Sequence, residues 1–271
     1  MDSHVKTKIQ QILNAFETGS AEGDYGAISV FADAAGERKQ YTIGRSQTTE
    51  SGFLKIMLQN YVKNKGIYAN EMSFFADKIQ PHNGRGAYSK SIYPSPDFEK
   101  LIRKAAKDPI MKSTQDVFFD ERYWKPAYKF FVDNGFTTPL AMLVIYDTAI
   151  HSGPALNSKS SMMHVLRQRF GEKTPINGGD EKKWIAAYVN ARHKWLANHP
   201  SRPILRKTIY RTNTLKKLIA DNNWELNGNI NANGVIIKDQ HGRSPVKTAT
   251  VAPIEAKKLS WWQKIIKSIF G

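Results

Sequence analysis

The sequence predicts a mainly α-helical α+β fold in which two lobes share a cleft beside a small β-hairpin. Apolar residues recur at helical spacing in several stretches, and two short runs, AISVF and QYTIG, have the character of strands. A stretch punctuated by Gly and Pro, residues 81–97, is the expected boundary between the lobes. With 271 residues and 41% hydrophobic content, the chain can bury a sizeable core.

The N-terminal elements are predicted from spacing. Ile9, Ile12, Leu13 and Phe16 follow one helical face and Gly19 supplies a stop, so residues 5–18 are predicted to form an amphipathic helix. AISVF and QYTIG, joined by ADAAGERK, are predicted to form a hairpin. Residues 53–64 return to helical spacing.

Two strong helices are predicted further along the chain. TTPLAMLVIYDTAIHSG begins with a Thr138 cap and Pro139, and its run is so apolar that this helix is expected to be central. GGDEKKWIAAYVNARHKWLANH is capped by Asp180 and places aromatic residues on one face. A catalytic unit of two lobes is therefore expected over residues 1–226.

The C-terminal part is predicted to be looser. Residues 227–252 are expected to form a hairpin or a linker. Residues 253–271 place apolar side chains at helical spacing among lysines, which predicts a cationic amphipathic helix. Such a helix could dock on the body of the protein. We expect instead that it lies on an anionic membrane, because the Pro-punctuated linker SPVKTATVAP detaches it and its tryptophans suit the headgroup level.

Charge and composition limit the function classes. The net charge of +16 favours a polyanionic partner, although a basic protein without such a partner is the alternative. The absence of cysteine excludes disulfides and thiolate metal sites. No apolar run suits a signal peptide or a membrane span. We therefore expect cytoplasmic synthesis, and a target outside the cytoplasm would require a delivery route.

Two carboxylates suit the cleavage of a glycosidic bond, which needs a protonated acid and, for inversion, a base that activates water. Glu17 ends the apolar stripe of the first helix, where desolvation would raise its pKa, although a surface carboxylate at a helix end is the alternative. Asp33 follows the first strand of the hairpin and would stay ionised as the base. Thr42 on the second strand offers a hydroxyl for the attacking water.

The order of FETG, FAD and YTIG resembles the Glu, Asp, Thr arrangement of phage-type lysozymes. Residues 8–220 resemble the chitosanases of glycoside hydrolase family 46 through YTIGRSQTT, TTPLAMLVIYDTAIHSGP and GGDEKKWIAAYVNARHKWL. This resemblance implies a lysozyme-like fold of two lobes and an inverting mechanism. It makes Glu17 the acid, Asp33 the base and Thr42 the residue that positions water. No cofactor is expected.

One departure from the family pattern leaves the base open. The segment between Asp33 and Thr42 is longer than in the family, and Glu37 lies five residues before Thr42, so Glu37 is the alternative base. Asp33 is favoured because it ends a strand and would be held firmly. Within the YTIGRSQTT motif, Tyr41, Arg45 and Gln47 are the residues expected to contact substrate.

Asp147 lies inside the most apolar helix, and Arg192 interrupts the aromatic face of the other strong helix. A buried charge is costly without a partner, so the two are expected to pair near the site, with His151 as a second possible partner of Asp147. A structural role in joining the lobes is favoured over direct catalysis. The histidines show no metal-ligand pattern, and no metal is assigned.

The polymer is inferred from charge. A strongly basic enzyme would be repelled by chitosan and drawn to the anionic bacterial wall, which favours a muramidase acting on peptidoglycan. Such a protein would be a phage endolysin or an interbacterial effector, with a delivery system or an immunity protein as further partners. The alternatives are a chitosanase and a non-catalytic wall-binding module. Nucleic acid is not expected, because the basic residues are dispersed.

Overall fold

The computed structural model describes residues 1–34, 38–45, 47–79, 91–200 and 203–239. Its helices are α1 (Ser3–Thr18), α2 (Leu54–Lys63), α3 (Ala69–Lys78), α4 (Pro96–Ala105), α5 (Pro109–Phe119), the π-helix η1 (Asp120–Trp124), α6 (Lys125–Asp133), α7 (Pro139–Ser152), α8 (Met162–Arg167), the 3₁₀-helix η2 (Pro175–Asn177), α9 (Glu181–Ala197), α10 (Pro203–Arg206) and α11 (Ile209–Ala220). Its strands are β1 (Ile28–Ala34), β2 (Arg38–Ile43), β3 (Thr48–Thr49), β4 (Ile230–Ala232) and β5 (Val235–Ile237).

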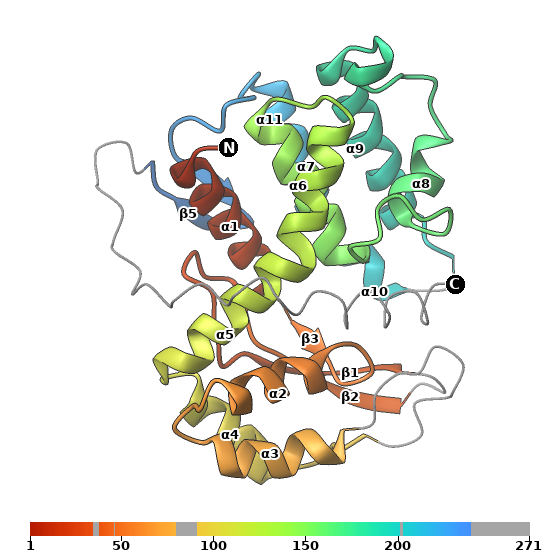
Figure 1. Ribbon diagram of the computed structural model, residues 1–271. Helices are drawn as coiled ribbons and strands as arrows, with labels where there is room; N and C mark the ends of the chain where they lie inside the picture. The colour runs from red at the N-terminus through yellow and green to blue at the C-terminus, as the bar shows by residue number, and fades with distance from the viewer. Residues whose placement is uncertain (35–37, 46, 80–90, 201–202, 240–271) are drawn as a thin grey trace.

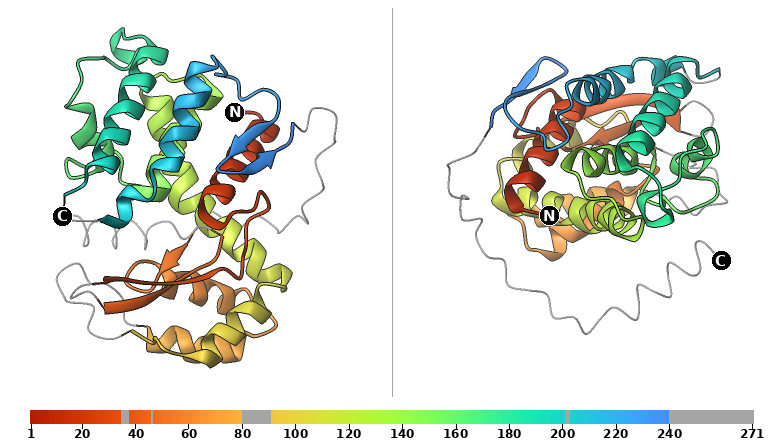
Figure 2. Two further views of the ribbon diagram at one scale, coloured as in Figure 1. Left: turned by 180° about the vertical axis from the view of Figure 1, so that it is seen from behind. Right: turned by 90° about the horizontal axis from the view of Figure 1, so that it is seen from above.

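The described chain forms two lobes, each with its own hydrophobic core (Figure 1). The small lobe contains the sheet β1–β2–β3 and helices α2 to α5, and the large lobe contains α1, α6 to α11 and the hairpin β4–β5. The predicted fold class, mainly helical α+β with two lobes, is confirmed. Figure 1 and the left view of Figure 2 show that the sheet of the small lobe lies towards the large lobe, while α3 and α4 lie on its far side.

The lobes are joined by a continuous helical path, α5–η1–α6. The α5 residues pack in the core of the small lobe and the α6 residues in that of the large lobe, while Tyr123 of η1 packs against both cores. The expected lobe boundary at residues 81–97 is therefore wrong, because that segment connects α3 and α4, which pack in one core. The chain passes from one lobe to the other as a helix, and the sequence of η1 contains no Gly or Pro.

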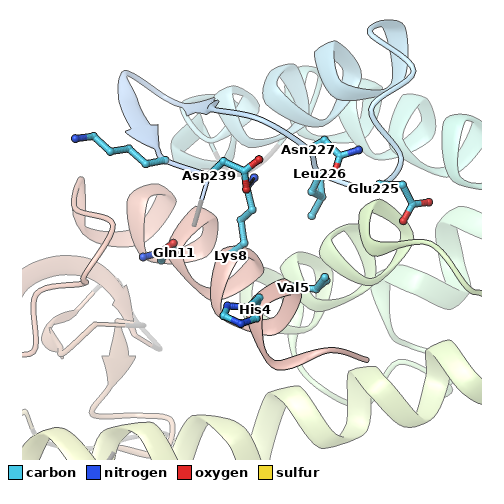
Figure 3. Close-up of a pocket in the computed structure, with 9 residues that line it drawn as sticks. His4, Val5, Lys8, Gln11, Glu225, Leu226, Asn227 and Asp239 are labelled. Atoms are coloured by element: carbon cyan, nitrogen blue, oxygen red, sulfur yellow. Dashed lines mark hydrogen bonds and ion pairs between the residues drawn. The ribbon is translucent and has the colours of Figure 1, made fainter. Parts of the chain in front are cut away.

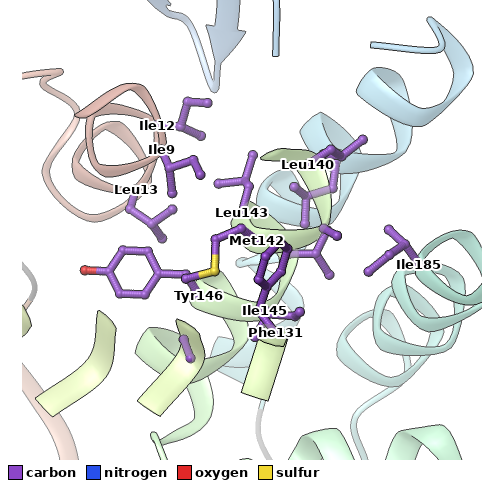
Figure 4. Close-up of a cluster of buried hydrophobic side chains, with 14 of the residues drawn as sticks. Ile9, Ile12, Leu13, Phe131, Leu140, Met142, Leu143, Ile145, Tyr146 and Ile185 are labelled. Atoms are coloured by element: carbon purple, nitrogen blue, oxygen red, sulfur yellow. The ribbon is translucent and has the colours of Figure 1, made fainter. Parts of the chain in front are cut away.

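The large lobe is built around α7, as its sequence predicts. Every residue from Pro139 to Ala149 is buried. Figure 4 shows Ile9, Ile12 and Leu13 of α1 directed towards α7 residues, with Ile185 of α9 approaching from the other side. Glu181 at the start of α9 accepts hydrogen bonds from the backbone N–H groups of Thr137 and Thr138, which fixes the N-terminus of α7 beside α9.

The predicted hairpin is present and gains a third strand. β1 pairs antiparallel with β2 in a register that places Ser29 opposite Thr42, and β2 pairs with β3, where Thr42 lies opposite Thr49. The register shifts between Phe31 and Ala34. Such an irregularity bends a strand and re-aims its side chains.

A second hairpin, β4–β5, follows Trp224 and packs against α1, with Ile230 and Ala232 in the large core. The predicted amphipathic helix at 253–271 lies outside the described residues, as does part of the predicted linker. In the described part of the chain, no helix has the length and apolar content needed to cross a membrane.

Candidate active site

Glu17 occupies the last turn of α1, where the helix is ended by Gly19. Gly19 has a φ of 71° and donates its N–H to the carbonyl of Ala15, which is the left-handed stop that glycine favours. The Glu17 side chain is 13% exposed, and its Oε1 accepts a hydrogen bond from Nη1 of Arg211 at 2.7 Å. Burial raises the pKa of Glu17 above its ordinary value, against the opposing charge of Arg211. The carboxyl group therefore has the environment of a general acid.

Arg211 links Glu17 to a buried network. Its Nε donates to Oδ1 of Asp147 at 2.8 Å, and the other Asp147 oxygen, Oδ2, accepts from Nη1 of Arg192. Burial alone would raise the pKa of Asp147, but the charges of Arg192 and Arg211 hold it far below its ordinary value. The predicted pairing of Asp147 with Arg192 is confirmed, and both side chains are fully buried. The expected role in joining the lobes is wrong, because α7 and α9 both pack in the core of the large lobe.

Sequence reasoning missed Arg211. The residue lies four and seven positions before Leu215 and Leu218, which are both buried, so it shares the buried face of α11. That spacing was the available signal, because a cation on an apolar helical face needs a partner. The two buried arginines are tolerated because two carboxylates, Asp147 and Glu17, lie beside them.

His151 lies one helical turn after Asp147, and its Nδ1 has no hydrogen-bond partner among the described residues. Burial, together with the charges of Arg211 and Arg192, lowers the pKa of His151 to about 3. The ring is therefore neutral at ordinary pH. The arginines occupy the role that was considered for His151 as a partner of Asp147.

A pocket with a volume of about 410 Å³ brings Glu17 together with the small lobe. The large lobe contributes Glu17, Ile150, His151, Ile204, Leu205 and Thr208, and the small lobe contributes Phe31, Ala32, Thr42, Gln47 and Thr49. The pocket is thus formed between the lobes. Among the described residues that line it there is no lysine or arginine.

Thr42 faces this pocket from the strand β2. The residue is 3% exposed, and its Oγ1 has no hydrogen-bond partner among the described residues. A buried hydroxyl normally has a partner, so this group is available to a water molecule or a substrate hydroxyl. The geometry therefore brings two predicted residues, Glu17 and Thr42, to one pocket.

The base is not assigned by the structure. The backbone of Asp33 belongs to β1, next to the register shift, but its side chain is outside what the structure describes. Glu37 lies outside the described residues altogether. Asp33 as the base, with Glu37 as the alternative, stays a prediction.

Two of the three expected substrate contacts are buried elsewhere. Tyr41 is 0% exposed in the small core, where its hydroxyl donates to Glu99 at 2.8 Å. Arg45 is also buried and forms an ion pair with Asp116 at 2.8 Å. Neither residue lines the pocket that Thr42 faces. Strand alternation turns Tyr41 away from the face that Thr42 occupies, and Arg45 is held by Asp116 and by the side chain of Asn14 in α1. Gln47 does line the pocket.

A second hollow of about 290 Å³ lies beside the N-terminal half of α1 (Figure 3). Lys8 extends across it, where its Nζ contacts Oδ1 of Asp239 at 3.2 Å and the carbonyl of Gly228 at 2.6 Å. These polar groups are already paired, and we assign no ligand to this hollow. Within the described residues, no group of three or more His, Asp or Glu side chains could hold a metal ion.

Comparison with known proteins adds to this geometry. The profile of glycosyl hydrolase family 46 matches residues 11–230. A chitosanase of Bacillus subtilis strain 168 is 31% identical over 234 residues, which cover 83% of this chain and 80% of the relative. A chitosanase of Streptomyces sp. strain N174 is 24% identical over 193 residues, which cover 70% of this chain and 66% of the relative.

Solved structures agree with the sequence relatives. The native chitosanase of Bacillus subtilis MY002 superposes with a TM-score of 0.71 at 26% identity, covering 88% of this chain and 100% of the other. A mutant chitosanase from the same strain, complexed with 6 GlcN, gives a TM-score of 0.70 at 26% identity, with coverage of 88% and 100%. The described architecture and these matches lead to one conclusion: the chain belongs to glycosyl hydrolase family 46 and is a glycoside hydrolase.

Proposed function

We propose that this protein is a chitosanase that hydrolyses glycosidic bonds of a glucosamine polymer with inversion of configuration. One observation carries the proposal: Glu17, with a raised pKa, lines the pocket between the lobes together with Thr42. The family relatives support the choice of polymer, because the sequence relatives reported above are named chitosanases and one structure was solved with 6 GlcN.

In this mechanism Glu17 is the general acid. Its raised pKa keeps the carboxyl group protonated at a higher pH than usual, so that it can donate a proton to the leaving glycosidic oxygen. Once the proton has left, the hydrogen bond from Arg211 stabilises the resulting carboxylate. Asp147 and Arg192 hold the guanidinium of Arg211 in place behind the acid.

Inversion requires water on the opposite face of the sugar. The Thr42 hydroxyl, which has no partner among the described residues, would hold this water, and Asp33 or Glu37 would remove its proton. The hydroxide equivalent then attacks the anomeric carbon while the leaving oxygen takes the proton of Glu17. The product carries the configuration opposite to that of the bond cleaved.

The net charge of +16 does not place positive charge along the described lining of the pocket, where a cationic substrate would bind. The described lining of the pocket contains Glu17 and no lysine or arginine, and its histidine is neutral. The positive charge therefore lies elsewhere on the protein. The expectation of peptidoglycan as the substrate applied the net charge of the whole chain to the pocket, which lacks that charge. None of the relatives reported above supports a muramidase.

The test compares two polymers. The full chain should release reducing ends from chitosan and leave the turbidity of purified peptidoglycan unchanged. Clearing of peptidoglycan without action on chitosan would establish the muramidase alternative. Binding to either polymer without hydrolysis would establish a non-catalytic module.

The stereochemistry is tested on glucosamine oligomers. Proton NMR recorded in the first minutes of hydrolysis should show the product anomer opposite to that of the cleaved bond, before mutarotation equilibrates the two. Retention of configuration would reject the inverting mechanism while leaving the substrate assignment intact.

A further inference from the structure

The small lobe carries a dense group of exposed cations on the side away from the pocket. Residues 63–67 and 100–112 contain one acidic residue, the buried Asp108. We call the cations of these two segments the cationic tip, and all of them are exposed: Lys63, Lys65, Lys100, Arg103, Lys104, Lys107 and Lys112. Figure 1 shows α4, which bears Lys100, Arg103 and Lys104, at the far side of the small lobe from α10.

The cations of α4 lie on the polar face of an amphipathic helix. Lys100, Arg103, Lys104 and Lys107 recur at i, i+3, i+4 and i+7, which is one helical face and its C-terminal extension. The opposite face buries apolar residues such as Phe98 and Leu101 in the small core. The cations are therefore held on one outer surface.

The cations of the cationic tip have no carboxylate partner among the described residues, as is also the case for exposed lysines of the large lobe such as Lys183 and Lys216. Among the described residues, no carboxylate lies within 4.0 Å of these seven side chains, and Lys112 makes only a cation–π contact with Tyr25 at 5.9 Å. Three other exposed lysines of the large lobe form i,i+4 ion pairs: Lys125 with Glu121, Lys129 with Asp133 and Lys217 with Asp221.

Asp108 joins the two segments. Its Oδ2 accepts hydrogen bonds from the N–H of Ile67 at 2.8 Å and from the hydroxyl of Tyr61 at 2.7 Å, while its Oδ1 caps α5 through Ile110. The only carboxylate within the two segments is thus occupied. Three exposed carboxylates lie on neighbouring segments or in the first turn of α4, namely Asp24, Glu71 and Asp97, and they offset part of the seven positive charges. Glu99 of α4 accepts a hydrogen bond from the hydroxyl of Tyr41.

Ile67 protrudes at this junction. Its side chain is 72% exposed, although its backbone is held by Asp108. Lys65 lies two residues before Ile67, and Lys107 precedes Asp108, which binds the Ile67 backbone. An exposed aliphatic side chain with lysines close by along the chain offers the two features of a membrane-surface contact, namely an apolar group for the interface and cations for anionic headgroups. We propose that the cationic tip docks on a phospholipid bilayer that carries anionic headgroups.

The protruding Ile67 supports a bilayer over a nucleic acid. Six of the seven cations are lysines, whose point charges attract either kind of phosphate, so the apolar group decides between the two. The protruding side chain is aliphatic and offers no ring for base stacking. None of the residues of the cationic tip lines the pocket between the lobes, so docking would leave that pocket accessible.

The first experiment uses the absence of cysteine from the chain. An environment-sensitive fluorophore attached to Ile67→Cys in the full chain should shift to shorter wavelength and gain intensity with vesicles of phosphatidylglycerol and phosphatidylcholine. The same fluorophore on Val132→Cys, at a 55% exposed position of α6, should not change. Vesicles of phosphatidylcholine alone should affect neither. A response at Val132 but not at Ile67 would overturn the proposal, because another surface would then make the contact.

The second experiment compares two variants of equal net charge. Lys65→Gln/Lys104→Gln/Lys107→Gln should weaken partitioning onto the anionic vesicles about tenfold or more at low ionic strength, since each basic residue near the surface adds to the attraction. The control, Lys125→Gln/Lys129→Gln/Lys217→Gln, removes cations that already have carboxylate partners and should bind like wild type. Both should cleave a glucosamine hexamer normally. Equal loss in the two variants, or loss of binding to duplex DNA without loss on vesicles, would overturn the proposal.

Discussion

At the scale of single residues, the site depends on how one carboxyl group is kept protonated beside an arginine. Burial raises the pKa of Glu17, while Arg211 donates to the same oxygen that would carry the negative charge after proton transfer. The two effects oppose each other: burial keeps the proton on Glu17, and Arg211 favours its release. An acid without Arg211 would hold its proton more tightly and release it less readily.

Replacing Glu17 with Gln should lower hydrolysis of chitosan by about a hundredfold or more, which is the usual loss when a general acid is removed. The amide keeps the shape of the side chain but cannot donate a proton to the leaving oxygen. The rate is measured by reducing-end release, with Glu121→Gln on the exposed surface of η1 as the control. Activity of Glu17→Gln within a few-fold of wild type would remove Glu17 from the mechanism.

A pair of substitutions tests whether Asp33 or Glu37 is the base. Asp33→Asn should reduce hydrolysis nearly as much as Glu17→Gln, and Glu37→Gln should have a mild effect, because β1 would hold Asp33 firmly. Rescue by azide, a small anion that can attack in place of activated water, should appear only in the variant that lacks the base. The reverse order of the two losses would assign the base to Glu37.

Asp147 is expected to contribute to stability through its arginines. Asp147→Asn should lower the free energy of unfolding by roughly 3–5 kcal/mol, because Arg192 and Arg211 would remain buried without that charge. The folded-state pKa of Asp147 is lowered, so its contribution is present above the ordinary value of 3.8 and is lost as the pH falls below it. In denaturant titrations the difference between wild type and Asp147→Asn should therefore shrink below about pH 3.8. A gap that is independent of pH would show that Asp147 is not the group responsible.

At the scale of elements, apolar runs and helix caps in the sequence correctly predicted where individual helices form and end. The apolar run and the Thr138 cap predicted α7, and Gly19 predicted the end of α1. The Asp147 and Arg192 pair was predictable because both residues interrupt apolar faces. Arg211 was missed, although it satisfies the same criterion, because α11 was not singled out from its spacing.

Other features depend on contacts that a local pattern does not contain. The lobes meet along α5–η1–α6, which continues as helix through Pro126, while the Gly- and Pro-rich segment at 81–97 connects two helices of one lobe. Tyr41 and Arg45 stand beside Thr42 in sequence, yet Tyr41 is buried in the small core and Arg45 is paired with Asp116. Sequence adjacency to a site residue therefore did not predict membership in the site.

The end of β2 depends on a glycine. Gly44 has a φ of 80°, and a Cβ there would lie 2.5 Å from Oε1 of Gln115, which accepts from the N–H of Arg45 at 3.1 Å. Gly44→Ala should therefore destabilise the protein by about 1–3 kcal/mol through backbone strain and displacement of Gln115. Thermal unfolding measures the loss. Gly171→Ala, where a Cβ would meet nothing within 4 Å, is the control and should unfold like wild type. Equal melting temperatures for both variants would show that the turn tolerates a side chain.

At the scale of the whole molecule, charge acts differently on encounter and on binding. The net charge of +16 repels a polycation at long range, whereas the described lining of the pocket offers no cation to a sugar that has entered. The Debye length falls from about 30 Å at 0.01 M salt to about 10 Å at 0.1 M. Salt should therefore weaken the repulsion between the body of the enzyme and a long polymer before it affects contacts inside the pocket.

This difference predicts how activity responds to ionic strength. A long chitosan chain extends beyond the cleft and meets the field of the whole protein, while a glucosamine hexamer is confined largely to the cleft. The ratio of kcat/KM for the polymer to kcat/KM for the hexamer should rise as salt increases from about 0.01 M to about 0.1 M, because screening relieves repulsion that acts mainly on the polymer. Initial rates on both substrates at fixed pH give the ratio. A ratio that falls with salt would mean that the polymer is attracted by the surface beyond the cleft, which would contradict this account of how the net charge acts.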